Sequence, residues 1–200
     1  GDAPEQATLP RGFRVMFAGN VGVAQDFGVI LAAAEKLKSY ADIQWLILGD
    51  GRMLPWVKAQ IEARGLGGTF HLLGQHPVES MPEYFALADV MLVTLKKEPI
   101  FALTIPSKIQ SYLACGKPII AALDGEGARI VLESSAGLAV PAGNSEELAS
   151  AILEMYRMTE VERLAMGERG LKYFKENFER EMLLGRLDEW LNELGEKERQ

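Results

Sequence analysis

Six short apolar runs, each followed by a segment with helical spacing, constrain the fold of this 200-residue sequence more than any other feature. Such runs are typical of strands buried in a parallel sheet, which helices cover on both faces. Parallel strands also need long crossover connections, and helices usually supply them. The sequence therefore predicts an α/β fold with a six-stranded, parallel, doubly wound sheet of the Rossmann-like type. The expected strands cover residues 14–19, 43–48, 70–73, 89–95, 118–123 and 137–140.

Helical patterns fill the intervals and continue beyond the last strand. Helices are expected over about 26–37, 53–64, 81–87 and 107–115, after 127, after 144, over 159–177 and from 179 onward. Asn144 with Glu147, and Thr159 with Glu162, have the spacing of a capping box. The last two helices exceed what the sheet needs. We therefore divide the chain into a linker or lead-in (1–12), a Rossmann-like domain (13–178) and a C-terminal helix (179–200) whose apolar stripe faces a seam to another domain.

Composition excludes several classes of function. The net charge of −7 argues against a general nucleic-acid-binding protein, which would present a basic face. The single cysteine, Cys115, excludes an internal disulfide framework and any multi-cysteine metal site. Neither His71 nor His76 has a second ligand at metal-binding spacing, so no metal site is expected. The sequence has no apolar run of about twenty residues. We expect a cytoplasmic protein.

The segment 104–131 carries the strongest signal for a ligand site. It reads as loop, helix, strand, glycine-rich turn and helix, with Ser107 expected to cap the first helix. Ligands of such folds gather where strands end and helix N-termini present free N–H groups, which favours a phosphate-bearing ligand. Lys108, in the first helical turn, would add a positive charge. Glu98, Asp124 and Glu126 follow strands and offer acceptors to sugar hydroxyls.

The pair Gly49 and Gly51 raises a dinucleotide site as an alternative. Leu54 replaces the third glycine of that fingerprint, and no acidic residue follows at the end of a next strand about twenty residues on. A tight turn in a mononucleotide-type fold is the better interpretation. No nucleophile elbow or P-loop occurs, so the sequence gives no support to hydrolase or NTPase functions.

Taken together, these segments resemble the C-terminal half of GT-B glycosyltransferases of the large retaining family 4. The resemblance covers nearly the whole chain and is carried by the order of several strings, which match best the bacterial amino-sugar and fucosamine transferases. They are F-A-G-N-V-G-V-A-Q-D-F (17–27), L-G-D-G (48–51), L-L-G-Q-H-P (72–77), A-D-V-M-L (88–92), I-P-S-K-I-Q-S-Y-L-A-C-G-K-P-I-I (105–120) and G-L-A-V-P-A-G-N (137–144).

The resemblance implies a domain that binds a UDP-sugar donor, for transfer with retention at the anomeric carbon in surface polysaccharide or glycolipid synthesis. UDP-sugar would be a substrate, with no cofactor and no obligatory metal. The partners implied are a missing N-terminal domain, an acceptor glycan or glycolipid, no nucleic acid, and peripheral association with the inner face of the membrane. The catalytic candidate is Glu98. The donor-binding candidates are Gly19, Asn20, Gly22, Gln25, Gly49, Asp50, Gly51, Gly74, Gln75, His76, Thr104, Ser107, Lys108, Ser111, Asp124, Gly125, Glu126 and Gly127.

The chain departs from the family pattern at the positions expected to face the donor. Asn20 and Gln25 stand where much of the family carries arginine and lysine, and Ser111 stands in place of the second of two glutamates. The first glutamate corresponds to Glu98 or is absent. Two alternatives therefore stay open. One is an enzyme resembling UDP-sugar 2-epimerases, and the other is a non-catalytic nucleotide-sugar-binding module.

Overall fold

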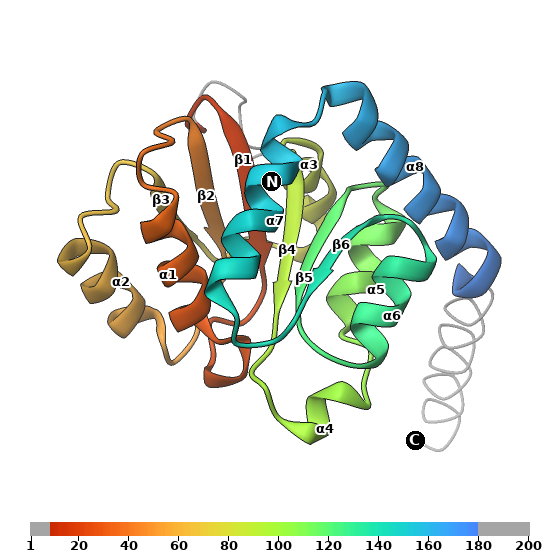
Figure 1. The fold of residues 1–200 in the computed structure, drawn as a ribbon, viewed down its shortest axis with the longest axis horizontal. Coiled ribbons are helices and arrows are strands. Elements are labelled where there is room, and N and C mark those ends of the chain that lie inside the picture. The colour runs from red at the N-terminus through yellow and green to blue at the C-terminus, as the bar shows by residue number, and fades with distance from the viewer. Residues whose placement is uncertain (1–8, 180–200) are drawn as a thin grey trace, which may run out of the picture.

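The computed structural model describes residues 9–179, and a sheet of six parallel strands forms its centre (Figure 1). The strands are β1 (Phe13–Ala18), β2 (Ile43–Leu48), β3 (Phe70–Gly74), β4 (Val90–Thr94), β5 (Ile119–Ala122) and β6 (Gly137–Val140). Their order is β3-β2-β1-β4-β5-β6, and every neighbouring pair is parallel. The predicted fold class is confirmed.

Helices connect all the strands, as the alternating pattern predicts. They are α1 (Phe27–Lys36), α2 (Leu54–Ala63), α3 (Met81–Ala86), α4 (Pro99–Ala102), α5 (Ser107–Ala114), α6 (Glu126–Glu133), α7 (Ser145–Arg157) and α8 (Glu160–Asn177), with 3-10 turns η1 (Val23–Gln25) and η2 (Val78–Ser80). Only α4 and the two 3-10 turns were not predicted. The expected C-terminal helix and its apolar stripe lie outside the described residues, except for its first position.

Two hydrophobic clusters, one on each face of the sheet, hold these layers together. Alternate residues of β1 divide between them: Val15 and Phe17 pack with α1, α2 and α7, whereas Met16 and Ala18 pack with α3, α5, α6 and α8. Because successive side chains of a strand point to opposite faces, a strand covered by helices on both sides is apolar throughout. This is why the strands read as largely apolar runs, although β1 contains Arg14, β2 Gln44 and β3 His71.

The helix ends follow the sequence signals with one correction. Thr159 and Glu162 form the predicted capping box at α8, and the Asn144 side chain accepts a 3.0 Å hydrogen bond from the Glu147 N–H at α7. The prediction that Ser107 caps α5 is wrong. Pro106 occupies the capping position in an extended conformation, and Ser107 is already the first helical residue.

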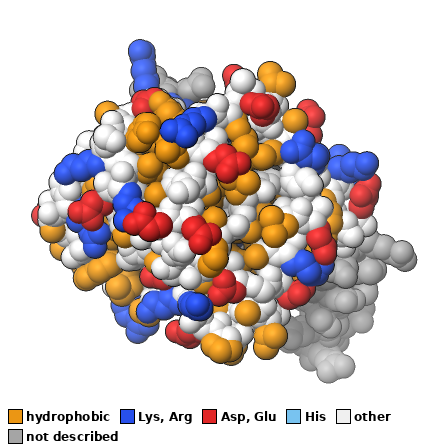
Figure 2. Space-filling model, viewed as in Figure 1, with side chains coloured by type: hydrophobic (Ala, Val, Ile, Leu, Met, Phe, Trp, Pro, Cys, Tyr) orange, Lys and Arg blue, Asp and Glu red, His pale blue; other side chains and the backbone are white. Residues whose placement is uncertain are grey.

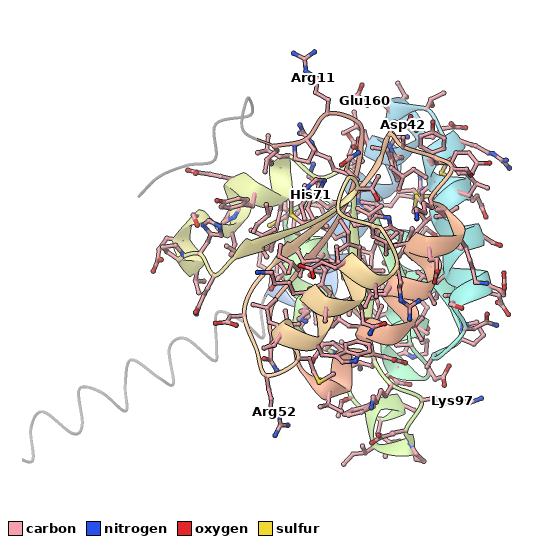
Figure 3. All side chains as sticks on the ribbon, turned by 90° about the vertical axis from the view of Figure 1, so that its left-hand side faces the viewer. Arg11, Asp42, Arg52, His71, Lys97 and Glu160 are labelled. Carbon is pink, nitrogen blue, oxygen red and sulfur yellow. The ribbon has the colours of Figure 1, made fainter. Side chains whose placement is uncertain are left out.

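The carboxyl ends of the parallel strands meet at one edge of the sheet. Figure 3 shows Arg52 and Lys97 at this edge, with Arg11 and Asp42 at the opposite one. On the face covered by α1 and α7, acidic and basic side chains are interspersed (Figure 2), so this face carries no extended basic patch. Within residues 9–179, no helix combines the length and apolarity that crossing a membrane would require.

Candidate functional site

The strand order reverses between β1 and β4, so the loops that follow these two strands diverge and leave a crevice between them. A pocket of about 590 Å³ opens there, which we call the first pocket. Residues at or just after the ends of β1, β2 and β3 line it, together with residues of η2, α3 and α5. Of the predicted donor-binding residues, it brings together Gly19, Asn20, Gly49, Asp50, Gln75, His76, Ser107, Lys108 and Ser111.

Lys108 is the cation of the first pocket. Its side chain crosses Gly19, where an added Cβ would lie 2.5 Å from Lys108 Cε, so the path of the lysine depends on that glycine. Its ammonium group lies 4.0 Å from the centroid of the Phe17 ring. Burial lowers the pKa of Lys108 to about 8. Among the described residues it has no carboxylate partner, and a phosphate could therefore bind it without displacing one.

Tyr112, which the sequence analysis did not single out, ties α5 to the end of β1. Its hydroxyl lies 3.3 Å from both the backbone nitrogen and the backbone oxygen of Ala18, the residue before Gly19. The side chain is buried, and burial raises the pKa of its hydroxyl. Tyr112 therefore fixes the spacing between the floor of the first pocket and the helix that carries Lys108.

His76 lines the same pocket with both ring nitrogens engaged. Its Nε2–H donates to the Leu73 carbonyl at 2.9 Å, and the Tyr84 hydroxyl lies 3.0 Å from Nδ1. The carbonyl can only accept, so this arrangement assigns the proton to Nε2. An orientation fixed at two points suits a residue that shapes a binding surface better than one that transfers protons.

A second pocket, of about 360 Å³, adjoins the first and shares Asn20 with it. It holds three more predicted residues, Gly22, Gln25 and Glu98. The Gln25 Oε1 accepts a 3.1 Å hydrogen bond from the Gly22 N–H, which closes the loop after β1 on itself. Two cations that the sequence analysis did not select, Arg52 and Lys96, also line it. Both follow strand ends by two to four residues, which is the signal that could have found them.

Two of the remaining candidate glycines support the loops around the pockets. An added Cβ on Gly51 would lie 2.4 Å from the Val21 carbonyl oxygen, so Gly51 allows the loops after β1 and β2 to approach. Gly74, with φ of +76°, accepts a 2.7 Å hydrogen bond from Gly49 N–H through its carbonyl. Thr104 is exposed, and its hydroxyl lies 3.4 Å from the Phe101 carbonyl.

The turn 124–127 does not join either pocket. The Asp124 Oδ1 accepts a 3.0 Å hydrogen bond from the Ala142 N–H, which links the ends of β5 and β6. Gly125 packs against the Ala102 carbonyl, and Gly127 is buried against the side chains of Pro106, Ile109 and Leu123. Glu126 forms an ion pair with Arg129 within α6. In this structure the four residues line neither pocket.

The remaining histidine and the cysteine have structural surroundings. His71 Nε2 lies 2.7 Å from the Gln44 side-chain oxygen, and burial lowers its pKa. Cys115 is half-buried, and burial raises the pKa of its thiol, which leaves little thiolate for nucleophilic chemistry. Over residues 9–179, the structure places no group of three or more His, Cys, Asp or Glu side chains where they could hold a metal ion.

Comparisons with known proteins agree with this geometry. The family model described as "Glycosyl transferases group 1" matches residues 12–158. The probable glycosyltransferase WbjE of Pseudomonas aeruginosa is 32% identical over 148 residues, which are 72% of this chain and 36% of that protein. A glycosyltransferase of Methanocaldococcus jannaschii, MJ1178, is 24% identical over 134 residues, 67% of this chain and again 36% of the relative. The chain thus spans about a third of the length of these relatives.

Solved structures show the same fold. HepE of Anabaena, crystallised with UDP and glucose, superposes with a TM-score of 0.77 at 19% identity, covering 94% of this chain and 50% of that chain. The C-terminal domain of the group 1 glycosyltransferase LpcC of Francisella tularensis superposes with a TM-score of 0.70 at 18% identity, covering 86% and 89%. The described residues therefore share the fold of the C-terminal domain of a group 1 glycosyltransferase.

Proposed function

This chain belongs to the group 1 glycosyltransferases, and we propose that it is the part of such an enzyme that binds a UDP-sugar donor. The observation that carries the proposal is the first pocket, where Lys108 faces an open space beside Gly19 and has no carboxylate partner among the described residues. The pocket lies where ligands of open α/β sheets bind, outside the carboxyl ends of the strands. HepE, whose fold this chain shares, was crystallised with UDP.

The finer parts of the proposal follow from the family resemblance. The enzyme would transfer the sugar with retention, without an obligatory metal, in the synthesis of a bacterial surface polysaccharide or glycolipid. It would act with an acceptor-binding domain on an acceptor at the inner face of the membrane. The 200 residues correspond to about a third of the relatives, so the chain alone should bind the donor without transferring it.

A non-catalytic binding module is the second candidate, and Ser111 favours it. Ser111 lines the first pocket where the family pattern has a glutamate, and its hydroxyl donates to the Ser107 carbonyl at 3.2 Å. A hydroxyl that already donates to the backbone of its own helix is a weaker hydrogen-bond acceptor for a sugar or ribose hydroxyl than a carboxylate would be. Full-length protein that binds UDP-sugars but transfers none to a panel of acceptors would support this candidate over the enzyme.

Calorimetric titration of the 200-residue chain with UDP tests the proposal directly. A charge-assisted hydrogen bond is worth roughly 1.5–3 kcal/mol, so Lys108→Ala should weaken UDP binding about tenfold or more. Lys58→Ala is the matched control, because Lys58 is exposed on α2 and lines neither pocket. Equal UDP affinities of the two variants, or no UDP binding by the wild-type chain, would contradict the proposal.

A further inference from the structure

The second pocket differs from the first in its charge. In the first pocket the charges of Asp50 and Lys108 cancel. In the second, Arg52 and Lys96 face a single carboxylate, that of Glu98, which leaves one positive charge in excess. Neither cation forms an ion pair with any residue that the structure describes. An excess of unpaired positive charge favours an anionic occupant.

Backbone hydrogen bonds fix the two cations on either side of the loop after β1. The Lys96 N–H donates to the Ala24 carbonyl at 2.8 Å, which brings the end of β4 against the 3-10 turn η1. The Met53 N–H donates to the Val21 carbonyl at 3.0 Å, which brings the loop after β2 against the same segment. Arg52 and Lys96 therefore border the same short loop, although they are 44 positions apart in the sequence.

The two side chains differ in how they can reach a ligand. Lys96 is half-buried, so its position is restricted by the loop that it contacts. Arg52 is exposed and projects from the carboxyl edge of the sheet (Figure 3), which leaves its guanidinium free to turn toward a bound anion. Guanidinium groups bind phosphate through two parallel N–H bonds, whereas a lysine acts as a point charge. Together they suit one phosphate group.

A nucleoside diphosphate brings about two negative charges, and Lys108 is the single Lys or Arg among the described residues that line the first pocket. Asn20 lies between the pockets and Gln25 in the second, and both are uncharged. We infer that Lys96 and Arg52 bind the outer phosphate of the donor, while Lys108 faces the inner phosphate and the first pocket holds the nucleoside. This inference rests on the proposed function and assigns the two cations that the sequence motifs do not contain.

The preference for UDP over UMP tests the inference, because the two ligands differ by the outer phosphate alone. We would titrate the 200-residue chain with each ligand at low salt and compare Lys96→Gln, Arg52→Gln and the double variant. In the double variant, the ratio of the UDP affinity to the UMP affinity should fall at least about tenfold, while the UMP affinity stays at the wild-type value. Lys97→Gln is the matched control, since Lys97 is the exposed neighbour in the same loop and does not line the pocket.

The outcomes separate this inference from the proposed function. Wild-type protein that binds neither UDP nor UMP would overturn the proposed function and the inference with it. A double variant that keeps the wild-type preference for UDP over UMP would overturn the inference alone. Titration of the wild type and the variants with UDP-glucuronate and with UDP-glucose tests whether the cations bind an acidic sugar instead of the outer phosphate. If the variants weaken only UDP-glucuronate, the cations serve an acidic sugar, and the assignment to the outer phosphate is wrong.

Discussion

The ammonium group of Lys108 lies 4.0 Å from the centroid of the fully buried Phe17 ring. A cation over an aromatic face is stabilised by about 0.5–2 kcal/mol, depending on how far it is desolvated. Burial acts in the opposite direction and lowers the pKa of Lys108 to about 8. The charge most useful for holding a phosphate is therefore also one that is readily lost when the pH rises.

UDP binding should consequently weaken between pH 7 and pH 9. The pKa of Lys108 is about 8 in the folded protein, below its ordinary 10.5, so its charge is mostly present at pH 7 and mostly absent at pH 9. Binding to the charged form alone predicts a loss of about tenfold in affinity at pH 9. Calorimetry at both pH values measures it. Lys108→Arg keeps its charge over this range, and an equally steep loss in that variant would assign the effect to the nucleotide.

The same shift predicts how the stability of the unliganded protein depends on pH. Between pH 8 and 10.5 the unfolded chain binds a proton at Lys108 that the folded chain has released, so the contribution of this group to stability rises with pH in that window. When the pH is raised from 7.5 to 9.5, the free energy of unfolding should therefore increase less for Lys108→Met than for the wild type. Urea unfolding of both proteins at the two pH values measures this difference. Parallel gains in the two proteins would contradict the lowered pKa.

Tyr112→Phe should lower the free energy of unfolding by about 1–2 kcal/mol, since it removes a buried hydroxyl that bonds the backbone of Ala18. Urea unfolding measures the change. Tyr40→Phe is the matched control, because the Tyr40 hydroxyl makes no hydrogen bond within the described residues and its loss should be nearly neutral. Equal stability of the two variants would show that the Tyr112 hydroxyl does not stabilise the end of β1.

Gly49→Ala should destabilise the domain by more than about 3 kcal/mol, because two effects add. Its φ of +138° is unfavourable for any residue with a side chain, and an added Cβ would lie 1.9 Å from the Gly19 carbonyl oxygen. Gly68→Ala has neither problem, since nothing lies within 4 Å of the added atom. Thermal unfolding compares the two. A Gly49→Ala protein as stable as Gly68→Ala would mean that the two loops do not approach as closely as described.

Thr159→Ala should lower the free energy of unfolding by about 0.5–2 kcal/mol, because it removes the side-chain cap of α8. Thr104→Ala removes an exposed hydroxyl with a single 3.4 Å contact and serves as the control. The close packing of α8 against the end of α5 depends on Gly167. A Cβ added at Gly167 would lie 2.0 Å from the carbonyl oxygen of Gly116, which follows α5. A loosened α8 should therefore also reduce protection from hydrogen exchange in α5, and an unchanged α5 would argue against this coupling.

The fold could be predicted from the sequence because hydrophobic patterning determines it locally. The run Ile43–Leu48 is six residues long and apolar at every position except Gln44, which is typical of a strand covered on both faces. The short helix α4 was missed because four residues are too few to show a helical period. The cap of α5 was misplaced because Pro106 and Ser107 are both acceptable at a helix start, and the backbone conformation decides between them.

The candidate site could be predicted only in part, because its residues meet through the sheet and not through the sequence. Lys108 was found from its place in the first turn of a helix, which is a local signal. The hydrogen bond that the Asp124 carboxylate accepts from the Ala142 N–H could not be predicted, because the pairing of β5 with β6 brings the two residues close. The role of Asp124 toward a sugar stays a prediction. Arg52 and Lys96 were overlooked because they belong to no familiar motif, although both follow strand ends.

The loops around the second pocket are held by main-chain atoms, through Met53 N–H to Val21 O and Lys96 N–H to Ala24 O. Main-chain bonds survive most changes of side chain, so positions 20, 52 and 96 can be varied while these two bonds hold the loops in place. Gln25 is different, because its side chain accepts from the Gly22 N–H and supports the loop itself. This separates what builds the pocket from what selects its contents. A combinatorial library at these three positions is the natural place to seek altered choice of the anionic group that the second pocket binds, whether by selection in the laboratory or by drift in evolution.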